Sequence, residues 1–247
     1  MENAPVIMMS FGSPTPGTDV ELYERFEQWV IEVYIPMRMK FVERMGTDFC
    51  QIIQESFEYP RNGTVSHYKN LDSWENSQKT QERNAVMEEI RSWQNRGVME
   101  QIWSPVYELE RSFRGDQKLE GDRVDTRIAD APIMHLEGYR LSSIEQKKYE
   151  NWLAEHGYNV FIPLFVKLPG IRGYDTYKIT GSRFVEAREI EYPSHLSIVY
   201  FENLKAYEDY ARSRELMVFQ KALRSVFPLG PNVKWHVQYQ LVKSWRK

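Results

Sequence analysis

Cysteine is nearly absent from this chain of 247 residues, and its single cysteine, Cys50, has no partner for an internal disulfide. A metal cluster built from several cysteines is excluded for the same reason. The N-terminal residues lack the basic segment of a secretory signal, and the most apolar run, 160–166, is too short to span a bilayer. Together these absences predict a protein of a reducing, cytoplasmic compartment without a membrane-spanning segment.

Neither sign of charge dominates the composition. The chain has 32 Lys and Arg residues against 35 Asp and Glu residues, for a formal net charge of −3. This balance gives no reason to expect nucleic acid or an anionic membrane as a partner. Aromatic residues make up 14% of the chain, and they can bury enough area to favour a folded globular protein over a disordered one.

Several motifs of well-known chemistry are also missing. The sequence contains no HxH or HExxH motif and no cluster of carboxylates at metal-ligand spacing. It has no glycine-rich loop that would hold a phosphate and no serine nucleophile elbow. From the sequence we therefore expect neither a metal nor another cofactor.

An internal repeat organises the chain. The segment FEQWVIE at 26–32 returns as YENWLAE at 149–155, and EYP at 58–60 returns as EYP at 191–193. A constant offset of 133 then pairs 70–71 with 203–204 and 91–92 with 224–225. Near the end, an offset of 132 pairs Trp103, Tyr107, Leu109 and Ser112 with Trp235, Tyr239, Leu241 and Ser244. So many matches in one order indicate a tandem duplication.

We expect the repeats to span 1–113 and 131–247. They flank a linker at 114–130, in which nine of 17 residues are charged and none is aromatic. Each repeat has the pattern strand, helix, two strands, helix, strand, which is the ferredoxin-like order β-α-β-β-α-β. The expected helices are 20–41, 71–93, 143–166 and 204–226. The expected strands are 6–11, 46–54, 64–68, 101–109, 133–139, 174–180, 195–201 and 233–242. Asn70 and Asn203 are candidate N-caps of the second helices.

The segment FIPLFVKLPGIRGY at 161–174 resembles a signature of the dimeric α/β-barrel superfamily, in its EthD-like, NIPSNAP-like and antibiotic-biosynthesis-monooxygenase-like members. Its Leu-Pro-Gly is expected to end a helix and turn the chain into a strand. The first repeat keeps only Ile35-Pro36. Members of this superfamily usually build the barrel from two chains. The resemblance and the duplication together imply an α+β fold of two tandem ferredoxin-like repeats, whose antiparallel sheets pack into an α/β barrel within one chain.

The resemblance has one departure that bears on chemistry. Several EthD-like members carry a histidine two residues before the proline of the first helix, where this chain has Tyr34 and Phe161. His156 matches that histidine's surroundings but stands farther from the proline, so the histidine's chemistry is not carried over. Some members of the superfamily bind haem, and His156, the one histidine on an expected helix, is its candidate proximal ligand.

Three histidines on expected strands are the candidate catalytic residues. His67 has Tyr200 as its duplication partner, and an imidazole facing a phenol across a pocket could transfer a proton. His135 shares a strand face with Glu137, and His236 lies on a polar face of the last strand. For each of them the alternative is a histidine held by hydrogen bonds in the core or on the sheet surface.

Aromatic side chains on the strands and the first helix are the candidate substrate-binding residues: Tyr34, Trp103, Tyr177, Tyr200, Trp235 and Tyr239. The alternative is that they pack the interior of the barrel. Asp48 and Asp175 are paired by the duplication and are read as strand-end carboxylates or acid–base groups. His195, beside a Tyr-Pro turn, is expected to be exposed.

The sequence leaves open whether the chain is an enzyme. The favoured function is a cofactor-independent monooxygenase, cyclase or isomerase that acts on a small apolar or aromatic molecule in a barrel pocket, with a pocket histidine abstracting a proton. The alternatives are a non-catalytic protein that binds a small molecule, haem included, and an oligomeric structural protein. The two repeats differ at Met8 and His135, at His67 and Tyr200, and at Ser104 and His236. This divergence predicts one dominant pocket.

Overall fold

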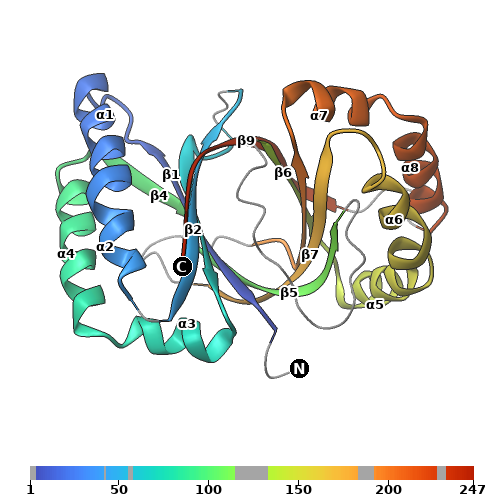
Figure 1. Ribbon diagram of the computed structural model, residues 1–247, viewed down its shortest axis with the longest axis horizontal. Helices are drawn as coiled ribbons and strands as arrows, with labels where there is room; N and C mark the ends of the chain where they lie inside the picture. The colour runs from blue at the N-terminus through green and yellow to red at the C-terminus, as the bar shows by residue number, and fades with distance from the viewer. Residues whose placement is uncertain (1–3, 42, 55–57, 115–132, 183–191, 227–231) are drawn as a thin grey trace. The chain divides into compact units, whose positions relative to one another are not determined.

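The computed structural model describes residues 4–41, 43–54, 58–114, 133–182, 192–226 and 232–247 (Figure 1). The chain divides into two compact units. The first unit comprises Met1–Glu108, Thr180–Ile190 and Tyr239–Lys247, and the second comprises Leu109–Ile179 and Glu191–Gln238. The strands β5 (Pro105–Arg114) and β9 (Asn232–Arg246) each contribute residues to both units.

In the first unit, antiparallel strands carry helices on one side (Figure 1). The strand β3 (Asn62–Tyr68) pairs with both β1 (Val6–Pro14) and β2 (Arg44–Ile52), and β1 also pairs with β4 (Met99–Trp103). The helices are α1 (Val20–Trp29), α2 (Ile35–Met39), α3 (Leu71–Gln78) and α4 (Gln81–Asn95). The core between α1, α4 and the strands includes Phe26, Val30, Phe49, Val86 and Ile90.

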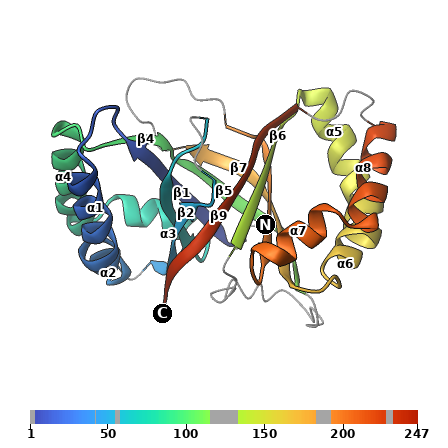
Figure 2. The same ribbon diagram turned by 90° about the horizontal axis from the view of Figure 1, so that it is seen from above.

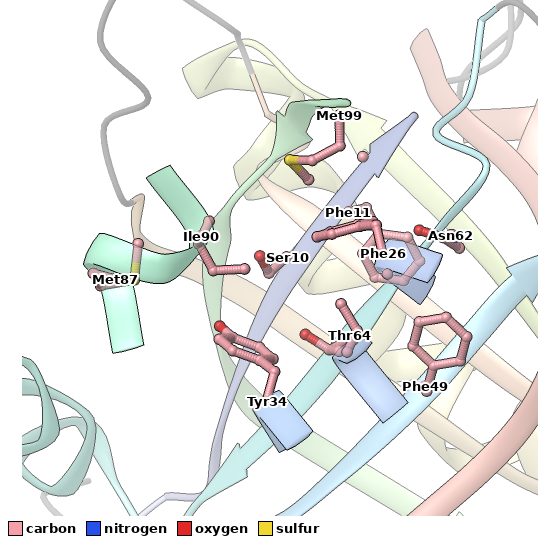
Figure 3. A pocket seen from close by; sticks show the side chains of 13 residues that line it. Ser10, Phe11, Phe26, Tyr34, Phe49, Asn62, Thr64, Met87, Ile90 and Met99 are labelled. Carbon is pink, nitrogen blue, oxygen red and sulfur yellow. The ribbon is translucent and has the colours of Figure 1, made fainter. Parts of the chain in front are cut away.

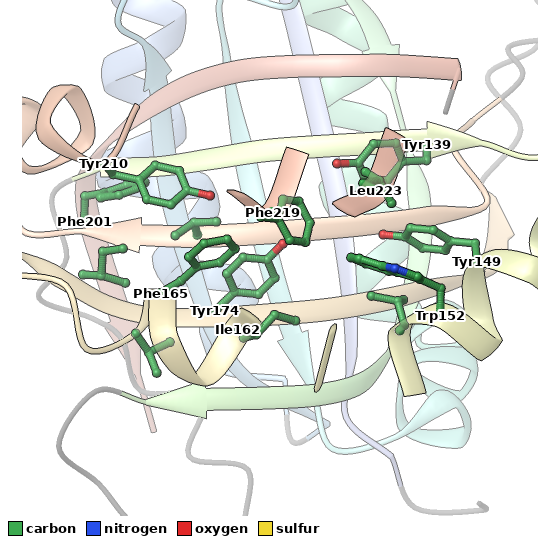
Figure 4. Packing of buried hydrophobic residues seen from close by; sticks show 14 of the residues in the cluster. Tyr139, Tyr149, Trp152, Ile162, Phe165, Tyr174, Phe201, Tyr210, Phe219 and Leu223 are labelled. Atoms are coloured by element: carbon green, nitrogen blue, oxygen red, sulfur yellow. The ribbon is translucent and has the colours of Figure 1, made fainter. Parts of the chain in front are cut away.

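In the second unit, β8 (His195–Phe201) pairs antiparallel with β6 (Ile133–Arg140) and β7 (Ile171–Ser182). The sheet order there is β9-β6-β8-β7-β5. The helices α5 (Ser143–Trp152), α6 (Ile162–Phe165), α7 (Leu204–Ala211) and α8 (Arg214–Val226) cover these strands (Figure 2). Aromatic rings dominate the core that they enclose, among them Tyr149, Trp152, Phe165, Tyr174 and Phe219 (Figure 4).

Each long first helix contains a stretch of wider π-helix. The segment η1 (Val30–Tyr34) separates α1 from α2, and η2 (Leu153–Phe161) separates α5 from α6. A proline follows at the second position of the next α-helical segment, Pro36 or Pro163. Because proline has no N–H and its ring clashes with the carbonyl four residues earlier, regular α-helical bonding cannot continue through it. The sequence predicted both helices but not this widening.

Local signals in the sequence account for several element ends. Asn70 and Asn203 accept hydrogen bonds from backbone N–H groups of the helices that follow, so both predicted N-caps are confirmed. Gly170, in the Leu-Pro-Gly turn after α6, has φ of +80°. A Cβ there would lie 2.4 Å from the Cβ of Ala206, so this turn requires glycine. The prediction that Leu-Pro-Gly ends the helix is confirmed.

The elements of both halves follow the predicted order, with the second helix of each split into two pieces, α3 and α4 or α7 and α8. The predicted strand 101–109 is also two strands, β4 and β5. Arg114 of the predicted linker ends β5, and residues 115–130 lie outside the described residues. The duplication and its borders stay predictions. Within the described ranges, every helix is too short or too polar to cross a membrane.

Candidate functional site

A small cavity lies between helices and strands of the first unit (Figure 3). Its volume is about 40 Å³. Its wall includes the aromatic or sulfur-containing side chains of Phe11, Phe26, Phe49, Met87 and Met99. An apolar cavity of about 150 Å³ holds benzene, so a ring-sized ligand requires the wall to yield. Methionine side chains are unbranched and flexible, which makes Met87 and Met99 the side chains best able to move.

Polar groups from three elements face this cavity. Ser10 comes from β1, Thr64 from β3 and Tyr34 from the end of η1, and all three line the cavity (Figure 3). Residues alternate between the two faces of a strand, so Asn62 and Thr64 face the helices while His67 belongs to the other face of β3. The cavity therefore combines apolar side chains with a few polar ones, the usual composition of a small-molecule site.

A buried arginine holds the phenol of Tyr34. The Nη1 atom of Arg38 donates a hydrogen bond of 2.6 Å to the phenol oxygen, and only 3% of Arg38 is exposed. Both residues stand on the same helix, four positions apart, on either side of Pro36. A phenol that accepts a bond from a guanidinium becomes a better donor to another oxygen. Tyr34 is thus suited to stabilise negative charge that develops on a bound molecule.

A second arginine is buried behind the first. Arg44 donates to the phenol of Tyr68 at 2.8 Å and to Thr47 Oγ1 at 3.1 Å. Neither Arg38 nor Arg44 has a carboxylate partner among the described residues. Burial and the charge of Arg38 lower the pKa of Arg44 to about 10. Burial alone would raise the pKa of Tyr68, but Arg44 and Arg38 lower it to about 8. The part of the first unit around Arg38 and Arg44 therefore carries concentrated positive charge.

Glu27 on α1 is connected to the cavity wall through Asn62. The side-chain amide of Asn62, which lines the cavity, donates a hydrogen bond to Glu27. Burial raises the pKa of Glu27 above its usual value, although Arg61 and Asn62 oppose this effect. A carboxylate with a raised pKa is a stronger base than an ordinary surface glutamate.

His67 is buried in a charged network rather than in the wall of this cavity. Its Nε2 lies 2.7 Å from Asp48 Oδ2. The other oxygen of Asp48 accepts bonds of 2.6 Å from Ser244 and Arg246. Although burial raises the pKa of Asp48, its contacts with His67 and Arg246 lower it below the usual value. His67 is therefore placed to stabilise a buried aspartate.

The second unit contains an equivalent network around Asp175. Its carboxylate accepts a bond of 2.5 Å from Ser112 and one of 2.6 Å from Arg114. Tyr177 donates to it at 3.3 Å. Burial and the charge of Asp175 raise the pKa of Tyr177, and a hydrogen bond with Tyr200 adds to this effect. The predicted substrate-binding residues Tyr177 and Tyr200 thus belong to a buried polar network.

The other two predicted catalytic histidines meet in the second unit. His135 Nε2 and His236 Nδ1 each lie 3.5 Å from Glu137 Oε1, and the ring centroids are 4.7 Å apart. His135 is 2% exposed, whereas 56% of the His236 side chain is exposed. Hydrogen bonds to Glu137 raise the pKa of His236 above its ordinary value. The sequence had placed His135 and Glu137 on one strand face, and the structure adds His236 to them.

The remaining predicted aromatic residues pack in the interior of their units. In the first unit, Trp103 and Tyr239 contact Phe11 with ring centroids 5.8 and 4.8 Å apart, so they support one wall of the cavity from behind. Tyr239 donates to the carbonyl of Pro60 at 2.9 Å. In the second unit, Trp235 packs on Tyr192 at 6.1 Å. Of the six predicted substrate-binding residues, Tyr34 lines this cavity.

The expectation that His195 is exposed is wrong. His195 is 2% exposed because it begins β8 beneath α5, where its ring lies 5.3 Å from that of Tyr149. Its Nε2 is 3.6 Å from Glu150. Burial lowers the pKa of His195 to about 4, so the imidazole is neutral at physiological pH. Glu150 is the repeat partner of Glu27. This pairing is the sequence signal that could have identified both carboxylates as candidate functional residues.

Comparisons with known proteins give structural likeness alone. No family model matches the chain. No curated protein matches it either. The structure is similar to an anthrone oxidase-like protein, with a TM-score of 0.67, 12% identity and coverage of 99% of this chain and 93% of the other. It is also similar to a candidate monooxygenase from Fusobacterium nucleatum, with a TM-score of 0.60, 8% identity and coverage of 100% and 96%.

A candidate chlorite dismutase shares the fold at a TM-score of 0.52, with 9% identity and coverage of 98% of this chain and 96% of the other. These proteins belong to the dimeric α/β-barrel superfamily with ferredoxin-like topology. At such low identity the likeness shows that the chain has this α+β barrel fold. It does not extend to activity or substrate, because one fold hosts many functions.

Proposed function

We propose that this chain is a cofactor-independent enzyme of the monooxygenase, cyclase or isomerase type, acting on a small and largely apolar or aromatic molecule in the cavity of the first unit. The observation that carries this proposal is Tyr34, which lines the cavity and whose phenol oxygen accepts a hydrogen bond from the buried Arg38. The descriptions of two proteins with this fold, a candidate monooxygenase and an anthrone oxidase-like protein, support it.

The three reaction types share a first step that the described residues can support. A proton leaves the substrate either from a carbon beside a carbonyl group, whose electron pair then moves onto the carbonyl oxygen, or from a phenol, whose oxygen keeps the pair. Tyr34 donates a hydrogen bond to that oxygen, and the charge of Arg38 stabilises the resulting anion. Glu27, which Asn62 holds by a hydrogen bond, accepts the proton that leaves the substrate. Burial raises the pKa of Glu27 and so makes it a stronger base. A monooxygenase would then use molecular oxygen as its second substrate.

This assignment moves the proposed chemistry away from the histidines that the sequence favoured. Met87, Met99 and the phenylalanine rings supply the apolar wall against which a flat ring would lie. The cytoplasmic setting predicted from the single cysteine remains part of the proposal, and so does a barrel built from tandem repeats. Assembly into a homo-oligomer remains an open alternative.

The test uses anthrone as the probe substrate and follows oxygen consumption by the full-length chain. We expect the Tyr34→Phe variant to lose about a hundredfold in kcat, which is the usual cost of removing one donor to a developing oxyanion, with a smaller change in KM. Glu27→Gln should lower kcat as well. Tyr210→Phe, which removes a buried phenol in the second unit, is the matched control and should keep wild-type turnover.

Saturable binding of anthrone without turnover would instead favour a non-catalytic binding protein. Equal turnover of the wild type and the Tyr34→Phe variant would refute the role of the phenol. A native mass spectrum of the freshly purified chain addresses the haem alternative, because retained haem would appear as excess mass over the denatured chain. His156, the candidate proximal ligand, has 55% of its side chain exposed and lies beside Glu155 and the ring of Trp152.

A further inference from the structure

We propose that His135, Glu137 and His236 in the second unit form a binding site for a divalent first-row transition-metal ion. His135 and Glu137 are two residues apart on β6, so their side chains lie on the same face of the sheet. β9 is the neighbouring strand of β6 and brings His236 to the same place. The candidate ligand atoms of the three side chains all lie within 4.8 Å of one another.

The spacing of these atoms is close to what a metal requires. Zinc binds histidine nitrogen and carboxylate oxygen at about 2.0–2.2 Å, so two ligands of a tetrahedral ion lie about 3.3–3.5 Å apart. Glu137 Oε1 is 3.5 Å from His135 Nε2 and 3.5 Å from His236 Nδ1. The widest of the three separations is at most 4.8 Å, so rotation of the side chains would bring all three atoms onto one ion.

Two further side chains hold the ligands in place. Tyr139 donates a bond of 2.8 Å to Glu137 Oε2, which leaves Oε1 directed at the two imidazoles. The side-chain nitrogen Nε2 of Gln238 lies 2.9 Å from His135 Nδ1. A half-turn of this amide would present its oxygen instead, so that Nδ1–H donates to it and Nε2 of His135 keeps its lone pair for the ion. Such outer hydrogen bonds fix the tautomer and orientation of metal-binding histidines.

The set of ligands indicates the class of ion. Two imidazoles and one carboxylate suit zinc, iron(II) or cobalt(II), whereas magnesium and calcium prefer sites made of oxygen alone. His135 is buried, but more than half of the His236 side chain is exposed. Three protein ligands with access to solvent leave a coordination position for water or a substrate.

The first repeat cannot form the same site. The duplication pairs His135 with Met8 and His236 with Ser104, and neither replacement is a strong ligand for these ions. The proposal therefore predicts one ion per chain. No short sequence motif marks this site, because the third ligand comes from a strand about 100 residues further along the chain.

The test is calorimetric titration of Zn²⁺ into the chelator-treated full-length chain, with Co²⁺ absorption as a second readout. We expect one saturable site per chain, and at least about a tenfold loss of affinity in His236→Ala and in Glu137→Gln. His236 is exposed, so its substitution should leave the fold intact, which circular dichroism checks. His156→Ala removes an exposed histidine beside Glu155 and is the matched control.

Wild-type affinity in the His236→Ala variant, or no saturable zinc binding by the wild-type chain, would overturn the proposal. A tetrahedral cobalt spectrum that disappears in His236→Ala would support it. Both readouts measure binding in the second unit. Neither readout depends on turnover in the cavity of the first unit, so failure of the metal proposal and failure of the proposed function can be told apart.

Discussion

The buried ion pair of Asp175 and Arg114 makes a quantitative prediction about the stability of the second unit. The guanidinium lies 2.6 Å from one carboxylate oxygen and 3.3 Å from the other, and the two side chains are 3% and 7% exposed. Asp175→Asn keeps one oxygen to accept from Ser112 but removes the negative charge. Arg114 then stays buried without a counter-charge. Such a loss costs about 3–5 kcal/mol, far more than a surface ion pair contributes.

Urea unfolding followed by tryptophan fluorescence is the assay. We expect the free energy of unfolding to fall by about 3 kcal/mol or more in Asp175→Asn. The matched control is Asp209→Asn, because Asp209 pairs with Lys205 on the exposed surface of α7, where loss of the charge should cost less than about 1 kcal/mol. Equal stability of Asp175→Asn and the control would refute the view that this network is a dry, charged core.

Two further predictions concern titration. Arg44 and Arg38 hold the pKa of Tyr68 at about 8, below its ordinary value of 10.0, so the free energy of unfolding should rise as the pH increases from about 8 to 10. Tyr68→Phe should abolish a phenolate absorbance step near pH 8. A Tyr68 phenol that ionises only above pH 10 would contradict this prediction. The pKa of His195 is lowered to about 4 from 6.5, so its neutral form contributes stability above pH 6.5 that is lost as the pH falls toward 4. An imidazole resonance of His195 that titrates near pH 6.5 would show that the ring is not buried.

Sequence reasoning reached the order of elements because the repeated segments and the turn signals are local. Asn70 and Asn203 act as caps through their own backbone neighbourhood, and Leu-Pro-Gly turns the chain because Gly170 tolerates φ of +80°. The π-helical segments were missed because a proline indicates that a helix is interrupted without indicating how the helix adapts.

The site was less accessible to sequence reasoning. Arginine is nearly always exposed, so nothing local distinguished Arg38 and Arg44 from surface residues. Their burial depends on α2 and α3, which β2 and β3 separate in the sequence, both packing against β2. His236 joins His135 through the pairing of β9 with β6, a contact across about 100 residues of chain. Periodicity predicts which residues share a face, but it does not predict which strands are neighbours.

The central claim is that the cavity of the first unit binds a small aromatic molecule. The most direct measurement is a binding titration of anthrone, followed by tryptophan fluorescence, with the wild-type chain and a Thr64→Leu variant. Thr64 faces the cavity from β3, so leucine would fill the space and remove a polar group. We expect saturable binding by the wild type and at least about a tenfold weaker affinity in the variant, equivalent to about 1.4 kcal/mol. Equal affinities would place the ligand elsewhere and contradict the account.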